Sequence, residues 1–191
     1  MQKEILIVGL NHRSAPIEVR ENVAFEASYL REALARLRAY PAIHEGVILS
    51  TCNRVEVVAA AADAPSACAE IKKFLDEQGA RRNAGQLDDH VYTHHGADAV
   101  RHVFRVAASL DSMVVGEPQI LGQLKDYYSA AQEAGTVGAI LHRLFHRAFS
   151  VAKRVRTETG IASRAVSVSS VAVDLARRIF DRFDDKTVML I

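Results

Sequence analysis

The chain has 191 residues, 49% of them hydrophobic, and its 24 basic and 23 acidic residues nearly cancel. This composition is typical of a globular protein, and the chain is long enough to bury a core without disulfides or a structural metal. The longest apolar runs, such as residues 57–62, are far shorter than the roughly 20 residues that cross a bilayer, so no membrane span is predicted. Cys52 and Cys68 lack the CxxC spacing of zinc sites, and no metal is predicted. Since no signal peptide is recognisable, we expect a cytoplasmic protein.

The first half of the chain alternates strand-like and helical segments. Short apolar runs of the strand type occur at residues 4–10, 47–50, 55–61 and 91–94. Helical spacing of apolar residues occurs at 29–40 and again after Pro65. The resulting order β-α-β-β-α-β is typical of a ferredoxin-like split β-α-β sandwich, which we expect over residues 1–95.

From Gly96 onward the apolar residues recur with the period of a helix. Helices are predicted from Gly96, from Pro118 to Gly135, from Val137 to Thr159 and from about Ser163 to Phe183. The fold class is therefore α+β, with a sheet subdomain over residues 1–95, a helical bundle over 96–160 and a long linker helix over 161–184. Residues 187–191 have the pattern of a buried strand without a partner, so we expect 185–191 to begin a further domain.

The pattern most typical of catalysis is the sequence Ser-Thr-Cys-Asn-Arg at residues 50–54, directly after a predicted buried strand. A cysteine on a loop held by a rigid strand suits a nucleophile. Arg54 could hold its thiolate, or bind a substrate carboxylate through two parallel hydrogen bonds. The alternative is that Cys52 is a small buried packing residue, because free cysteine is commonly buried.

Further polar residues follow the predicted sheet. His102 lies off the apolar stripe of Val100, Val103 and Phe104, so it either acts as a base or faces solvent. Glu117, Gln119 and Gln123 surround the start of the next predicted helix, where capping is the simpler explanation. Residues 143–164 are rich in arginine and form either the solvated face of a helix or a surface that binds phosphates.

Four segments together resemble the glutamyl-tRNA reductase family: residues 9–16, 49–54, 110–123 and 150–159. In that family a catalytic domain is followed by a spinal helix, an NADPH domain and a dimerisation domain. The resemblance covers essentially the whole chain and implies a catalytic domain over residues 1–160, a spinal helix over 161–184 and the first strand of the NADPH domain over 185–191. No GxGxxG motif is present, so no NADPH-binding residue is assigned to this chain.

The resemblance implies NADPH-dependent reduction of glutamyl-tRNA(Glu) to glutamate-1-semialdehyde through a cysteine thioester, the first step of tetrapyrrole (5-aminolevulinate) biosynthesis. It makes Cys52 the nucleophile and His102 a residue important for activity, for which we expect a role in proton transfer near Cys52. By charge, we expect Arg54 to bind the glutamyl carboxylate and Glu117 to accept from the α-ammonium group. The positions that match the substrate-binding residues of the family are Thr51, Asn53, Arg54, Ser112, Glu117, Pro118, Gln119 and Gln123.

The same resemblance implies glutamate-1-semialdehyde aminomutase as a protein partner, and a homodimer for the whole protein but a monomer for this chain. Without an NADPH domain we expect the chain to form the acyl-enzyme and to hydrolyse it slowly, as an esterase. An alternative from another class of function is a non-catalytic RNA-binding module, since RNA-recognition motifs also have a ferredoxin-like sheet. The predicted strands at 4–10, 47–50 and 55–61 contain no aromatic residue for base stacking, which favours the enzyme. A thiol-dependent acyltransferase unrelated to tRNA is a third alternative.

Overall fold

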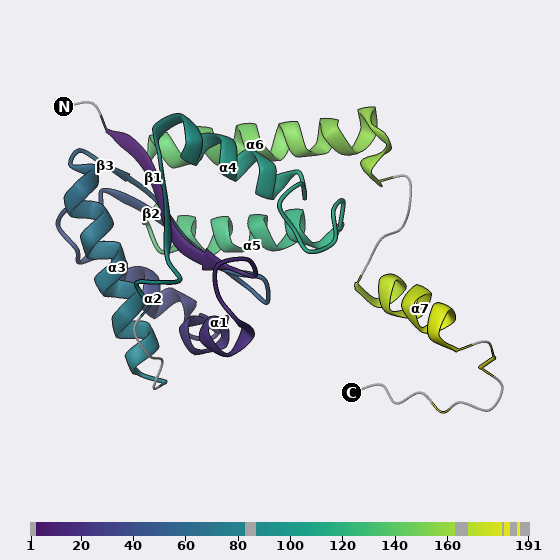
Figure 1. Ribbon diagram of the computed structural model, residues 1–191. Coiled ribbons are helices and arrows are strands. Elements are labelled where there is room, and N and C mark those ends of the chain that lie inside the picture. The colour runs from purple at the N-terminus through teal and green to yellow at the C-terminus, as the bar shows by residue number, and fades with distance from the viewer. Residues whose placement is uncertain (1–2, 83–86, 163–167, 181, 184–186, 188–191) are drawn as a thin grey trace.

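The computed structural model describes residues 3–82, 87–162, 168–180, 182–183 and 187 (Figure 1). Its centre is a four-stranded antiparallel sheet with the strand order β2-β3-β1-β4. The strands are β1 (Glu4–Asn11), β2 (Glu45–Thr51), β3 (Arg54–Ala61) and β4 (Tyr92–His95). This topology is that of a split β-α-β sandwich, so the predicted α+β class is confirmed.

One face of the sheet is covered by the helices of the first half of the chain, α1 (Ile17–Val23), α2 (Leu30–Arg38) and α3 (Ala64–Ala80). A Cβ atom on Gly46 of β2 would lie only 2.8 Å from the side chain of Leu37, so α2 packs closely on this face. The sequence analysis missed α1, because a helix of seven residues is too short to show a periodic pattern.

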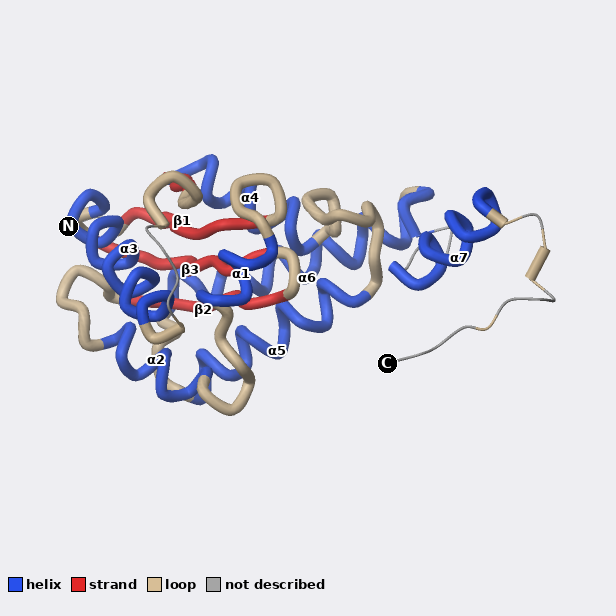
Figure 2. The backbone as a smooth tube through the Cα atoms, turned by 60° about the horizontal axis from the view of Figure 1, so that its bottom comes forward, coloured by secondary structure: helices blue, strands red, loops and turns tan. Residues whose placement is uncertain are grey.

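The other face is covered by α4 (Gly96–Ala107), α5 (Gln119–Glu133) and α6 (Ala139–Glu158). Glu45 of β2 accepts hydrogen bonds from backbone N–H groups at the start of α6, and Glu56 of β3 contacts His102 of α4. Figures 1 and 2 show the sheet between the two groups of helices, and all eight residues of β3 are buried. An RNA-recognition sheet needs one open face, so this arrangement does not support the RNA-binding alternative.

The predicted helix after Val137 is confirmed, and α6 ends at Glu158 with Thr159 as its C-cap residue, where the break was expected. A short 3-10 turn, Gly160–Ala162, follows it, and α7 (Val168–Ile179) lies within the linker helix predicted for 161–184. Figure 1 shows α7 apart from the sheet and from the other helices. The strand predicted for 185–191 falls outside the described residues except at Thr187, as does the predicted helix start at Ser163. No described helix is both long and apolar enough to cross a membrane.

Candidate active site

Cys52 lies in the tight turn that joins β2 to β3. Three hydrogen bonds hold this turn: Arg20 donates to the carbonyl of Cys52, the His12 N–H donates to the carbonyl of Asn53 at 2.9 Å, and the Asn53 N–H donates to Thr51 Oγ1 at 3.3 Å. Cys52 is exposed, so its interpretation as a buried packing residue is wrong. A rigid turn with an accessible thiol suits a nucleophile.

A small pocket brings Cys52 together with most of the residues predicted to bind substrate. Its wall is formed by the Cys52 turn, the loop after α4 and the first turns of α5. The predicted residues in its lining are Thr51, Cys52, Asn53, Arg54, Ser112, Glu117, Gln119 and Gln123. Pro118 does not line the pocket and is instead the N-cap residue of α5. Asp111 and Ile120, which the sequence analysis did not single out, also line it.

Beside this pocket Arg54 belongs to a buried ion-pair network that no sequence pattern indicated. Arg54 is only 1% exposed. Its Nη1 donates to Glu56 Oε1 at 2.7 Å, and its Nη2 donates to the backbone carbonyl of Asp111. The Nε atom has no hydrogen-bond partner. A substrate carboxylate could therefore bind both terminal nitrogens of Arg54 only by displacing Glu56 or Asp111.

His102 belongs to the same network. Its Nε2 lies 2.8 Å from Glu56 Oε1, and its Nδ1 lies 3.7 Å from Asp111 Oδ2. The prediction that His102 faces solvent is wrong, because the buried face of α4 is displaced from the predicted stripe and includes it. That face consists of Ala99, His102, Val103, Val106 and Ala107. His102 lines a second cavity instead of the Cys52 pocket, and no hydrogen bond joins it to Cys52 within the described part of the chain.

The charges of Glu56 and Arg54 are fixed over a wide range of pH. Burial alone would raise the pKa of Glu56, but the charge of Arg54 and hydrogen bonds from His102 and Tyr92 lower that pKa to about 2. Burial and the adjacent Glu56 carboxylate raise the pKa of Tyr92, so its hydroxyl stays a hydrogen-bond donor. Burial would lower the pKa of Arg54, but Glu56 more than offsets this and raises it. A permanent ion pair thus lies beside the pocket of Cys52.

Two residues that support the Cys52 turn were missed in the sequence. Arg20 of α1 is buried, and Tyr127 of α5 donates its hydroxyl to the carbonyl of Ser50, at the end of β2. The Ser50 side chain in turn accepts from the N–H of Phe25 at 2.8 Å. Arg20 stands among charged residues of a short helix, where a solvated side chain is the ordinary expectation, so only its burial in the fold identifies its role.

Neither a metal nor a dinucleotide has a site among the described residues. No group of three or more His, Cys, Asp or Glu side chains is placed there to hold a metal ion. The described strands all pair antiparallel, so the parallel β-α-β unit and glycine-rich turn that bind a dinucleotide do not occur in this part of the chain. The described residues therefore do not fit NADPH.

Comparison with known proteins gives consistent matches. Residues 8–159 match the family model described as glutamyl-tRNA(Glu) reductase, N-terminal domain. The glutamyl-tRNA reductases of Geobacter sulfurreducens and Geobacter metallireducens are each 57% identical over 188 residues, which is 98% of this chain and 43% of each relative. The solved structure of glutamyl-tRNA reductase from Methanopyrus kandleri is 37% identical with a TM-score of 0.69, over 91% of this chain and 39% of that one. The chain thus spans about two fifths of the length of these relatives.

Proposed function

The chain belongs to the glutamyl-tRNA reductase family, and we propose that it supplies the nucleophile with which the whole protein reduces glutamyl-tRNA(Glu) to glutamate-1-semialdehyde, using NADPH. This reaction begins tetrapyrrole biosynthesis. One observation carries the proposal: the exposed Cys52 shares a pocket with seven other residues at positions that match the substrate-binding residues of the family.

The step assigned to this chain is acylation. The Cys52 thiolate attacks the ester carbonyl carbon, a C–S bond forms, and the carbonyl oxygen becomes an oxyanion. The bond from carbon to the terminal ribose oxygen then breaks, that oxygen takes up a proton, and a thioester remains on Cys52. The first turns of α5 line the pocket, and its Pro118 N-cap makes no side-chain hydrogen bond, so the positive end of this helix can stabilise both the thiolate and the oxyanion.

The surrounding residues take different roles in this proposal. Glu117 is the anion in the pocket that can accept from the α-ammonium group of the glutamyl moiety. Arg54, buried in the wall of the pocket, supplies a fixed positive charge for the side-chain carboxylate. His102 contacts Glu56 instead of Cys52, so we assign it a positioning role through Glu56 and Arg54 in place of the expected proton transfer.

Reduction of the thioester needs a hydride donor that the described residues do not bind, so no step through NADPH is assigned to them. The homodimer of the whole protein, its partnership with glutamate-1-semialdehyde aminomutase and a cytoplasmic location stay predictions.

Acylation is tested by incubating the protein with tRNA charged with isotopically labelled glutamate, quenching with acid and measuring the intact protein mass. The parent and Cys68→Ser, the matched control for loss of a thiol, should carry a label that hydroxylamine removes, or should release free glutamate above background. Cys52→Ser should do neither. Label or glutamate release that persists in Cys52→Ser would show that Cys52 is not the nucleophile, and a parent inert in both assays would contradict the proposal.

A further inference from the structure

A second cavity adjoins the Cys52 pocket and takes no part in the chemistry assigned above. Its volume is about 530 Å³, and it lies beside the edge strand β4, between α4 and the loop that follows β1. Asp111 lines both this cavity and the Cys52 pocket. The backbone hydrogen bond from His12 to Asn53 also ties the loop after β1 to the Cys52 turn. The cavity is within the range of about 300–1,000 Å³ that small-molecule sites occupy.

The lining of this cavity carries an excess of positive charge. Arg13, Arg101 and Arg105 line it, against two carboxylates, Asp98 and Asp111. Both carboxylates are already paired, Asp98 with Arg101 and Asp111 with Arg13 and the buried Arg54. Arg105 is exposed and has no ion-pair partner within the described ranges. An anion entering the cavity would therefore meet one guanidinium without a carboxylate partner in the described ranges, that of Arg105, next to the exposed Arg101, and guanidinium geometry suits phosphate oxygens.

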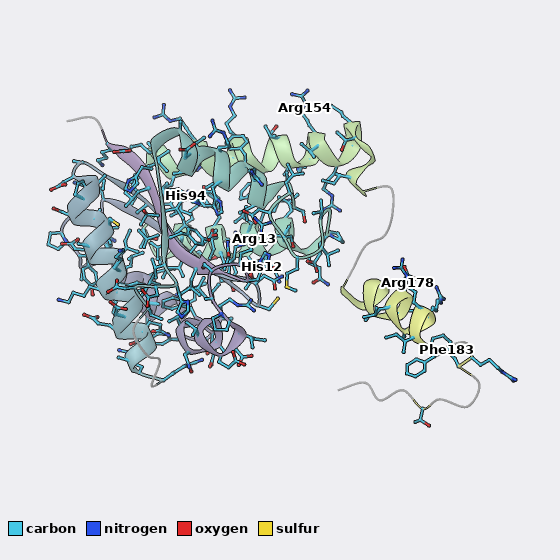
Figure 3. The ribbon with its side chains drawn as sticks, viewed as in Figure 1. His12, Arg13, His94, Arg154, Arg178 and Phe183 are labelled. Atoms are coloured by element: carbon cyan, nitrogen blue, oxygen red, sulfur yellow. The ribbon has the colours of Figure 1, made fainter. Side chains whose placement is uncertain are left out.

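The same cavity has an aromatic wall. His94 is half-buried, with its ring centroid 4.7 Å from that of His102 and 5.2 Å from that of Tyr92. Burial and the neighbouring His102 lower the pKa of His94, which favours the neutral imidazole. Figure 3 shows Arg13 and His12 close together at the end of β1, with His94 further back along that strand. An aromatic ring beside guanidinium groups is the combination that binds unpaired nucleotides, through base stacking and phosphate contacts.

We propose that this cavity binds the 3′-terminal nucleotides of the substrate RNA, with a phosphate on Arg101 and Arg105 and a base against His94. The inference rests on the proposed function. The ester that Cys52 attacks is at the 3′ end of the RNA, so the terminal ribose and the phosphates before it must lie next to the Cys52 pocket. Among the cavities of the described residues that adjoin that pocket, this one combines three arginines with an aromatic wall.

The test compares two RNA probes: uncharged tRNA(Glu) with its 3′-terminal CCA, and the same tRNA trimmed of these three nucleotides. The variant Arg101→Glu/Arg105→Glu should bind the intact tRNA at least about tenfold more weakly than the parent does, with a much smaller loss for the trimmed tRNA. The control Arg147→Glu changes an exposed arginine of α6 outside the cavity, and should affect both probes equally. Equal losses for both probes in the double variant, or no loss, would overturn the assignment.

Labelling of Cys52 by charged tRNA separates this inference from the proposed function. At low tRNA concentration the double variant should be acylated more slowly than the parent, and saturating tRNA should restore the rate, because the arginines bind RNA without touching the reacting atoms. If the parent is acylated and the double variant matches it at every concentration, only the cavity assignment fails. If the parent itself is not acylated and releases no glutamate, the proposed function fails.

Discussion

The Tyr92 hydroxyl and the Glu56 carboxylate meet across Gly9, which lies between them on strand β1. Gly9 pairs with Glu56 of β3 on one side and with Tyr92 of β4 on the other. Because glycine has no side chain there, Tyr92 can reach across β1 and donate to Glu56 Oε1. The same oxygen accepts from Arg54 and lies 2.8 Å from His102 Nε2. The Glu56 carboxylate of β3 therefore links this strand to β4, through Tyr92, and to α4, through His102, beside the Cys52 pocket.

Replacing Gly9 with alanine tests this arrangement. A Cβ atom at Gly9 would overlap the carbonyl oxygen of Val55 and lie 2.7 Å from Glu56 Cα, so β3 would have to move. We expect Gly9→Ala to lower the free energy of unfolding by about 1–3 kcal/mol, measured by urea denaturation. The control Gly122→Ala, in α5 with no atom within 4 Å of the added methyl, should raise it by up to about 1 kcal/mol. Similar effects of the two changes would refute the steric argument.

Glu56 should make the fold sensitive to acid. Its pKa is about 2 in the folded protein against an ordinary 4.5, so folding favours the ionised form. The resulting stabilisation, on the order of 3 kcal/mol, is fully present above pH 4.5 and is lost as the pH falls towards 2. Glu56→Gln should thus be less stable than the parent at pH 7, also because Arg54 loses its buried partner.

The measurement is urea denaturation of the parent and Glu56→Gln at pH 7, 5, 4 and 3. Acidic residues far from Glu56 contribute equally to both proteins, so the difference between the two reports on Glu56 and its contacts. That difference should shrink from pH 5 to pH 3. A constant difference would mean that Glu56 is not held ionised by its neighbours.

Local sequence patterns were sufficient to predict most of the fold. Apolar periodicity and the breaks at Pro118 and Thr159 predicted α5 and α6, because these signals lie within the helices themselves. The buried face of α4 was misplaced because His102 is polar, yet it is buried through its contact with Glu56. That contact joins residues 46 positions apart, and no local pattern reports it.

The residues of the candidate site also fall into two groups, those that the sequence predicts and those that only the fold identifies. The residues matched to the family, such as Cys52 and Gln123, come from separate segments that the fold brings into one pocket. The residues that hold this pocket in place could not be predicted, because a buried Glu56 or Arg20 is unfavourable on its own and is stabilised only by partners from distant elements. The family resemblance was therefore enough to predict the candidate residues of the pocket, whereas the buried residues that hold the pocket in place could not be predicted from the sequence.

Glu45 caps a helix that is far from it in sequence. Its carboxylate accepts from the N–H groups of Gly138, Ile140 and Leu141 at distances of 3.1, 3.3 and 2.8 Å, which satisfies the start of α6. Glu45→Ala should lower the free energy of unfolding by about 2 kcal/mol, because three N–H groups and the positive end of the helix lose a buried anion.

Thermal or urea denaturation measures this loss, and Glu45→Gln, which keeps one acceptor oxygen, should lose less. The control Glu133→Ala removes an exposed carboxylate whose one ion pair among the described residues is with the exposed Arg31, and should change stability little. A loss at Glu133 as large as that at Glu45 would contradict the capping role.

Arg20 should position the Cys52 turn without activating its thiol. In the part of the chain that the structure describes, its guanidinium donates to the backbone carbonyl of Cys52, and no hydrogen bond joins it to the sulfur. In a Cys68→Ser background, Arg20→Met should slow acylation by glutamyl-tRNA by about ten- to a hundredfold at saturating substrate, since small displacements of a nucleophile are costly. Alkylation of Cys52 by iodoacetamide, which needs no positioned substrate, should stay within about twofold of the parent.

The control for Arg20 is Arg82→Met, which removes an arginine that donates to the carbonyl of Glu21 in the same helix α1 but does not contact the turn. It should leave both rates unchanged. Unchanged acylation in Arg20→Met would show that Arg20 does not position Cys52. An equal fall in acylation and alkylation would show instead that Arg20 acts on the reactivity of the thiol, because a pure change of position affects only the reaction that requires a bound acyl group.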